Sequence, residues 1–155
     1  HWPTAVAAAA TEQAEAAHRA RGTDLSEGVP RGLRRDSPVW VYHGTSTAVL
    51  PRILDEGLVA EAPSRVEVLT GGRSARGVYV TAWPGAGVGL DYAQRAATWF
   101  GGKPVWLEIL APWGALSSDP DDVGIESGRW QHVADHIPPS WILRADFGAG
   151  WAPLD

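Results

Sequence analysis

The chain has 155 residues, 13 basic and 18 acidic side chains, a formal net charge of −5 and no cysteine. A chain of this length forms one domain by default. Its negative charge disfavours nucleic acid as a main partner, because phosphate-binding proteins carry a basic patch. The lack of cysteine excludes disulfides and thiolate metal sites, which fits a cytoplasmic enzyme and is also compatible with export. No apolar run approaches the roughly 20 residues of a membrane span, so no membrane partner is expected.

The N-terminal part is expected to form a helix followed by an arm. Residues 4–21 are rich in alanine, glutamate and glutamine, which favour helix. Residues 22–38 are rich in glycine, proline and charge and show no periodicity, so they read as a loop. We therefore assign residues 1–38 to an N-terminal helix and arm, and residues 39–155 to the main domain.

Short strands alternate with helices in the rest of the chain. Runs of β-branched and aromatic residues predict the strands, and glycine follows each predicted helix. The expected strands cover residues 39–43, 78–81, 104–110, 130–134 and 141–147, with a minor one at 66–69, and the expected helices cover residues 47–56 and 90–100. Several short strands combined with two or three helices predict a compact α+β domain.

The most informative pattern is a His-Gly-Thr sequence at the end of the first of these strands, formed by His43, Gly44 and Thr45. A histidine placed where a strand gives way to glycine leaves backbone groups free to bind a ligand. Tyr79 lies in the next main strand and Tyr92 lies near the start of the following helix. Tyrosine rings can form the walls around a flat ring.

In this order, these residues resemble the NAD-binding core of ADP-ribosyltransferases. The similar branch carries a His-Tyr-acid triad and includes diphtheria-toxin-like toxins, poly(ADP-ribose) polymerases and rifamycin-modifying ADP-ribosyltransferases. The resemblance spans residues 39–147 and implies an α+β domain with a split β-sheet. It also implies a mono-ADP-ribosyltransferase, which cleaves NAD⁺ at the nicotinamide–ribose bond and transfers ADP-ribose to a small-molecule or protein acceptor.

The resemblance implies a role for each of these residues. His43 would hydrogen-bond one of the two riboses of NAD⁺, and the Gly44 backbone would hold the nicotinamide carboxamide, with Thr45 close to the same ligand. Tyr79 and Tyr92 would stack on the two faces of the nicotinamide ring, since a cationic ring favours aromatic faces. NAD⁺ is then a co-substrate, and no metal is expected.

The acidic member of the triad has more than one candidate. Asp119 follows the strongest predicted strand and resembles the acid of the rifamycin-modifying enzymes. The polymerases carry glutamate at the start of the next strand, where this chain has Gln131, with Glu126 five residues earlier. Glutamine can hydrogen-bond a ribose hydroxyl but supplies no charge.

Two other functions remain open. RNA 2′-phosphotransferases share the fold, the His-Gly-Thr strand and a late Pro-Pro segment like Pro138-Pro139. They usually carry histidine where this chain has Tyr79, together with an N-terminal winged-helix domain that residues 1–38 cannot supply. The glutamine at position 131 also suggests a non-catalytic NAD-binding module.

Overall fold

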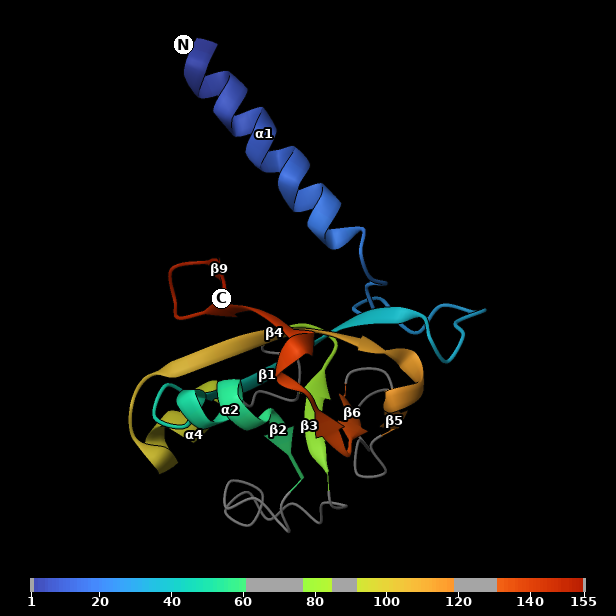
Figure 1. The fold of residues 1–155 in the computed structure, drawn as a ribbon, viewed down its shortest axis with the longest axis vertical. Helices are drawn as coiled ribbons and strands as arrows, with labels where there is room; N and C mark the ends of the chain where they lie inside the picture. The colour runs from blue at the N-terminus through green and yellow to red at the C-terminus, as the bar shows by residue number, and fades with distance from the viewer. Residues whose placement is uncertain (1, 61–76, 85–91, 119–130, 155) are drawn as a thin grey trace.

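The computed structural model describes residues 2–60, 77–84, 92–118 and 131–154 (Figure 1). The expected strand at 66–69, Asp119 and Glu126 lie outside these residues. The helices are α1 (Trp2–Arg19), α2 (Leu50–Glu56) and α4 (Tyr92–Phe100). The strands are β1 (Pro38–Ser46), β2 (Leu58–Val59), β3 (Val78–Thr81), β4 (Pro104–Pro112), β5 (Ser117–Ser118), β6 (Gln131–Ala134), β7 (His136–Ile137), β8 (Ile142–Asp146) and β9 (Trp151–Pro153).

The strands form one large sheet and one small sheet. The large sheet has seven strands in the order β5-β6-β3-β1-β4-β8-β9, and β2 pairs with β7 in a two-stranded sheet. The registered strand pairs in both sheets are antiparallel. The α+β class expected from the sequence is therefore confirmed.

The first strand is longer than expected, which corrects the prediction that His43 lies at its end. β1 continues to Ser46 because Gly44, Thr45 and Ser46 pair with the start of β4. The following helix begins at Leu50 rather than at residue 47. Pro51 occupies its first turn, where a missing backbone N–H costs nothing.

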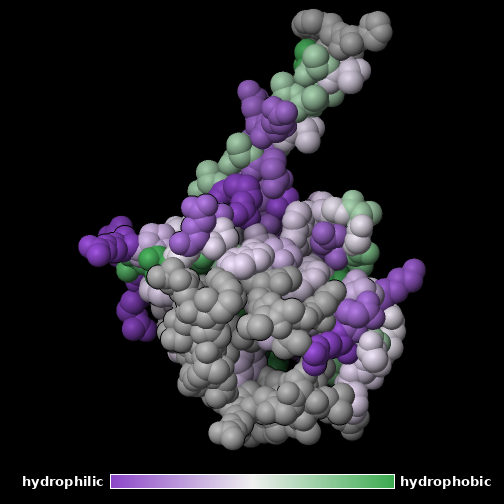
Figure 2. Space-filling model, turned by 180° about the vertical axis from the view of Figure 1, so that it is seen from behind, coloured by the Kyte–Doolittle hydropathy of each residue, from purple (hydrophilic) through white to green (hydrophobic). Residues whose placement is uncertain are grey.

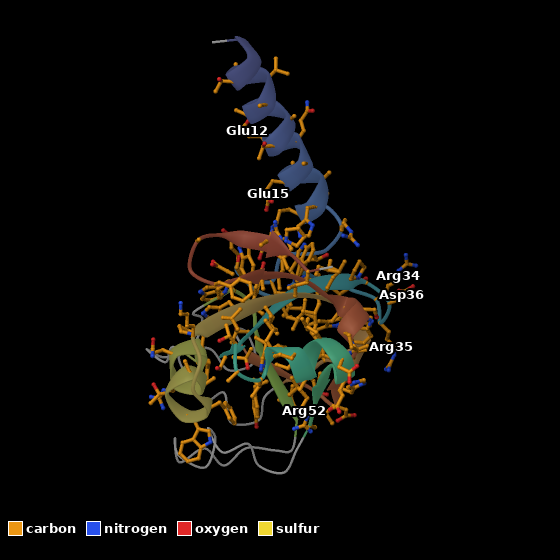
Figure 3. The ribbon with its side chains drawn as sticks, turned by 60° about the vertical axis from the view of Figure 1, so that its left-hand side comes forward. Glu12, Glu15, Arg34, Arg35, Asp36 and Arg52 are labelled. Carbon is orange, nitrogen blue, oxygen red and sulfur yellow. The ribbon has the colours of Figure 1, made fainter. Side chains whose placement is uncertain are left out.

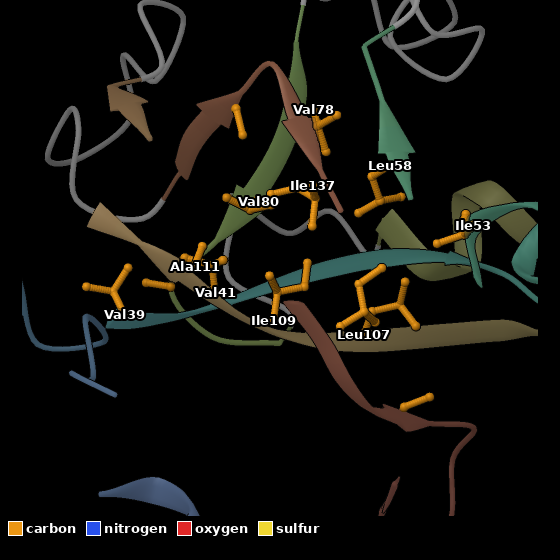
Figure 4. Packing of buried hydrophobic residues seen from close by; sticks show 14 of the residues in the cluster. Val39, Val41, Ile53, Leu58, Val78, Val80, Leu107, Ile109, Ala111 and Ile137 are labelled. Atoms are coloured by element: carbon orange, nitrogen blue, oxygen red, sulfur yellow. The ribbon is translucent and has the colours of Figure 1, made fainter. Parts of the chain in front are cut away.

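The two faces of the central strands β1 and β4 pack against different parts of the chain. One face carries Val39 and Val41 of β1 and Leu107 and Ile109 of β4, which join the main apolar core. This face packs against side chains of α2, β2, β3 and β7 (Figure 4). The alternation of side chains along a strand assigns the intervening residues to the opposite face.

The opposite face holds a fully buried carboxylate, Glu108 of β4. Arg144 of β8 donates from Nε to Oε1 at 2.7 Å and from Nη2 to Oε2 at 2.8 Å. His18 of α1 donates from Nε2 to Oε1 at 2.6 Å. Burial alone would raise the pKa of Glu108, but the hydrogen bonds from Arg144 and His18 hold it below the ordinary value of 4.5.

These contacts dock the last turn of α1 onto the sheet. Arg19 donates from Nη1 to the Tyr42 hydroxyl at 2.6 Å, and its carbonyl accepts a hydrogen bond from Trp40 Nε1 at 2.9 Å. Glu15 accepts from Arg144 Nη1 at 2.8 Å. We call the contacts of Glu15, His18 and Arg19 with the sheet the α1 clamp. It includes every residue of α1 that is hydrogen-bonded to the sheet within the described chain.

The rest of α1 extends away from the domain (Figure 1). Residues 4–17 are exposed, and hydrophilic side chains gather at the end of the helix that meets the domain (Figure 2). Glu15 lies near that end, whereas Arg34 and Arg35 lie on the arm at the edge of the molecule (Figure 3). The arm is anchored as well, because Leu25 is fully buried in the main core.

We predict that Glu108→Ala lowers the free energy of unfolding by about 3–5 kcal/mol, because it leaves Arg144, whose side chain is only 12% exposed, without its main partner. Glu56→Ala is the matched control, since Glu56 forms an exposed ion pair with Arg52 at 3.0 Å, and it should cost at most about 0.5 kcal/mol. Urea denaturation at pH 7 measures both values.

The same comparison has a defined pH dependence. A carboxylate with a lowered pKa stabilises the fold above its ordinary pKa, and this contribution is lost as the pH falls through the lowered value. The stability difference between the wild type and Glu108→Ala should therefore shrink below pH 4.5, the ordinary value. Equal costs for the two variants at pH 7, or a constant difference down to pH 2, would contradict the clamp.

Candidate functional site

The large sheet opens between β1 and β3, directly beside His43. The register between these two strands consists, in the described chain, of the pair Tyr42 and Thr81. Beyond this pair, the His43 ring rather than a backbone amide reaches β3, with Nδ1 lying 2.8 Å from the carbonyl oxygen of Tyr79. A carbonyl only accepts, so Nδ1 carries the hydrogen and Nε2 carries the lone pair of the neutral ring.

His43 is held in its neutral form. Burial lowers the pKa of His43 below the ordinary value of 6.5, and the hydrogen bond to the Tyr79 carbonyl opposes this shift only in part. Nε2 has no hydrogen-bond partner within the described residues. The ring therefore offers one acceptor, suited to a hydroxyl group of a ligand.

The backbone groups of Gly44 point into the same opening. Alternate residues of an antiparallel strand direct both backbone groups to the same side. Trp40 N–H donates to the carbonyl of Thr23, and the Ser46 carbonyl accepts from Val49 N–H, so both residues direct these groups away from β4. Gly44 lies an even number of residues from both, so its backbone groups point to the same side as theirs. Its N–H and C=O therefore face the β3 side, where strand pairing has already ended.

Gly44 also has a steric reason to be glycine. A Cβ atom at this position would lie 2.7 Å from the backbone nitrogen of Ala93 and 3.1 Å from Cη2 of Trp106. The first turn of α4, which begins with Tyr92, thus sits directly over the Gly44 backbone. Any side chain here would push that turn away.

Four of the predicted residues therefore meet at this end of the sheet. His43 contacts the Tyr79 carbonyl, and α4 brings Tyr92 next to Gly44. Tyr79 alternates with the buried Val78 and Val80, which assigns it to the Gly44 face, and both tyrosines are partly exposed.

Thr45 lies deeper than the other members of the motif. It is 4% exposed and pairs with Val105 of β4. Its hydroxyl has no hydrogen-bond partner within the described residues.

The acidic member of the predicted triad is only partly described. Gln131 begins β6 and pairs with Thr81 of β3, which in turn pairs with Tyr42 of β1. Gln131 therefore lies in line with Tyr42 and Thr81, the pair at which the opening between β1 and β3 begins. The other two candidates lie outside the described residues.

Sequence reasoning assigned no role to Trp106 or Glu108, yet both shape this region. A signal was present for Glu108, because it interrupts the apolar run from Val105 to Ala111. A single charge in a buried strand requires a partner. Trp106 gave no comparable signal, since its contact with Gly44 arises only from the pairing of β1 with β4.

No family model and no curated protein matches this sequence. Within the described parts of the chain, no three histidine or acidic side chains are grouped so that they could hold a metal ion. In the same residues, no helix combines the length and apolar character needed to cross a membrane.

We predict that Gly44→Ala destabilises the protein by about 1–3 kcal/mol, the usual cost of forcing an extra group into a packed position. The clash is with the backbone of Ala93, so it cannot be relieved by rotating a side chain. Urea denaturation measures the loss. Unchanged stability would mean that α4 does not rest on Gly44.

Proposed function

We propose that this protein is a mono-ADP-ribosyltransferase that cleaves NAD⁺ at the nicotinamide–ribose bond and passes ADP-ribose to an acceptor. The observation that carries the proposal is the pair of Gly44 backbone groups that face the β3 side, beside a neutral His43. A peptide N–H and C=O side by side match the C=O and NH₂ of a carboxamide such as that of nicotinamide.

Each group then has a part in binding. Gly44 holds the carboxamide, and Nε2 of His43, which has no partner among the described residues, accepts a hydrogen bond from a ribose hydroxyl. Tyr79 and Tyr92 provide aromatic faces for the nicotinamide ring, which is cationic in NAD⁺ and is therefore attracted to them.

The reaction needs orientation and charge stabilisation more than a side-chain nucleophile. As the bond between the ribose carbon and the nicotinamide nitrogen breaks, its electron pair leaves with nicotinamide and positive charge develops on the ribose. A lone pair of the acceptor then forms the new bond, and the acceptor's proton passes to solvent. Holding the ring and the ribose in place lowers the barrier by fixing this geometry.

We predict that His43→Ala and Tyr79→Ala each lower the rate of nicotinamide release from NAD⁺ by about 100-fold, the usual effect of misplacing a reacting group. His136→Ala is the matched control, because His136 is an exposed histidine that hydrogen-bonds the Glu56 carbonyl at 3.1 Å. Its rate should stay within about twofold of wild type, as expected for an exposed side chain in the small sheet. Mass spectrometry of released nicotinamide gives all three rates.

The pH profile adds an independent check. Protonation of Nε2 removes the acceptor, and burial holds the pKa of His43 below 6.5. The rate of nicotinamide release should stay level as the pH falls to 6.5 and decline only below it.

NAD⁺ binding without nicotinamide release would identify a binding module, and release of 2′-phosphate from RNA would identify the phosphotransferase alternative. Neither binding nor turnover would refute the proposal.

We propose Asp119 as the acid that supports the developing positive charge, on its resemblance to the rifamycin-modifying enzymes. Asp119→Asn should lower nicotinamide release by about 10²–10³-fold, the usual effect of losing one electrostatic stabiliser. The double variant Asp119→Asn/Gln131→Glu is measured beside it. Recovery of nicotinamide release in the double variant would assign the acid position to β6. A release rate of Asp119→Asn within about twofold of wild type would exclude Asp119.

A further inference from the structure

A row of residues runs across the sheet from the candidate site to the C-terminal strand. The strand register pairs Gly44 of β1 with Trp106 of β4, Trp106 with Asp146 of β8, and Asp146 with Trp151 of β9. Paired residues share a face of the sheet, so the row lies on the face opposite the main core. The side chains of Trp106, Asp146 and Trp151 are all partly exposed.

The row begins at the candidate site itself. Trp106 Cη2 lies 3.1 Å from the position that a Cβ of Gly44 would occupy. Neighbouring strands are about 4.8 Å apart, so the row extends roughly 14 Å from Gly44 to Trp151. That length suits a small molecule lying beside the nicotinamide end of NAD⁺.

The outer end of the row is held rigidly by its own hairpin. Asp146 Oδ1 accepts hydrogen bonds from the backbone N–H groups of Gly148 at 2.7 Å and Gly150 at 3.2 Å. These glycines have φ values of 110° and 105°, which other residues rarely adopt. The second oxygen, Oδ2, has no hydrogen-bond partner within the described residues.

Trp151 is fixed from the other side by the residues around the α1 clamp. Its ring lies 5.6 Å from the ring of Tyr42 at a tilt of 43°, and the Arg144 guanidinium lies 5.7 Å from its centroid. Arg144 is in turn held by Glu108 and Glu15. The indole therefore has a fixed position and a partly exposed surface, as a stacking platform requires.

We propose that Trp106, Asp146 and Trp151 form the acceptor-binding shelf, which takes a small molecule with a flat ring and an amine or hydroxyl donor. The tryptophan rings would stack on the flat ring, and Asp146 Oδ2 would accept from the donor. This inference rests on the proposed function and names its acceptor class. Trp106 borders Gly44, so an acceptor bound on the shelf would lie beside the candidate site.

Tyramine is a suitable probe, because it combines a phenol ring with an ammonium group. Its binding to the full chain can be measured by isothermal titration calorimetry without NAD⁺, which separates this test from the proposed function. Trp151→Ala should weaken tyramine binding by at least about fivefold, the lower end of stacking effects. Asp146→Asn should weaken it as well, because Asn keeps the oxygen that binds the glycine amides and replaces the free oxygen with an NH₂ group.

Phe147→Ala is the matched control, since Phe147 lies in the same hairpin and is 50% exposed. It should bind tyramine as the wild type does. The shelf is refuted if the wild type does not bind tyramine, if Trp151→Ala binds it equally well, or if Phe147→Ala loses as much affinity. If NAD⁺ is cleaved, transfer of ADP-ribose to tyramine should fall in Trp151→Ala and stay at the wild-type rate in Phe147→Ala.

Discussion

The buried carboxylate of Glu108 organises the half of the molecule that carries the candidate site. A charge without solvent contact is tolerated only when hydrogen-bond donors, at least one of them an opposite charge, surround it. Here those partners come from α1 and β8, so one carboxylate joins the first helix to the C-terminal hairpin. Tyr42, which belongs to the same face, is held by Arg19 from one side and by Trp151 from another. The strand that carries His43 is thereby fixed one residue before the motif begins.

The second organising feature is the interruption of pairing between β1 and β3. A continuous ladder would use the backbone groups of Gly44 and leave no place for a ligand. Instead, the His43 ring donates a hydrogen bond to the Tyr79 carbonyl, which satisfies that carbonyl without closing the sheet. The opening is bounded by β4, which pairs with β1 along its whole length, and by the first turn of α4.

Local patterns predicted much of this arrangement. The longer strands β1, β3, β4, β6 and β8 and both internal helices were predicted because their periodicity and glycine stops are local properties of the sequence, and Tyr79 was correctly assigned to a strand. The short strands β2, β5, β7 and β9 were missed, because two or three residues carry too little pattern to predict a strand. The predicted end of β1 at His43 was wrong. Glycine usually breaks strands, but here β4 pairs with Gly44 and continues the strand. Cross-strand contacts had no sequence signal. The closeness of Trp106 to Gly44, and the row that reaches Trp151, depend on register, which residue spacing along the chain does not reveal.

The free-standing part of α1 has a consequence for how the protein unfolds. Residues 4–14 are exposed and lie beyond the clamp, and alanine-rich helices keep partial helicity in water by propensity alone. Those turns can fray and re-form without disturbing the sheet, since they lie beyond the clamp. Far-UV circular dichroism therefore sums two processes: a gradual helix–coil change in α1 and a cooperative transition of the domain. The fully buried Trp40 is hydrogen-bonded to the clamped end of α1, so its environment changes only in the second process.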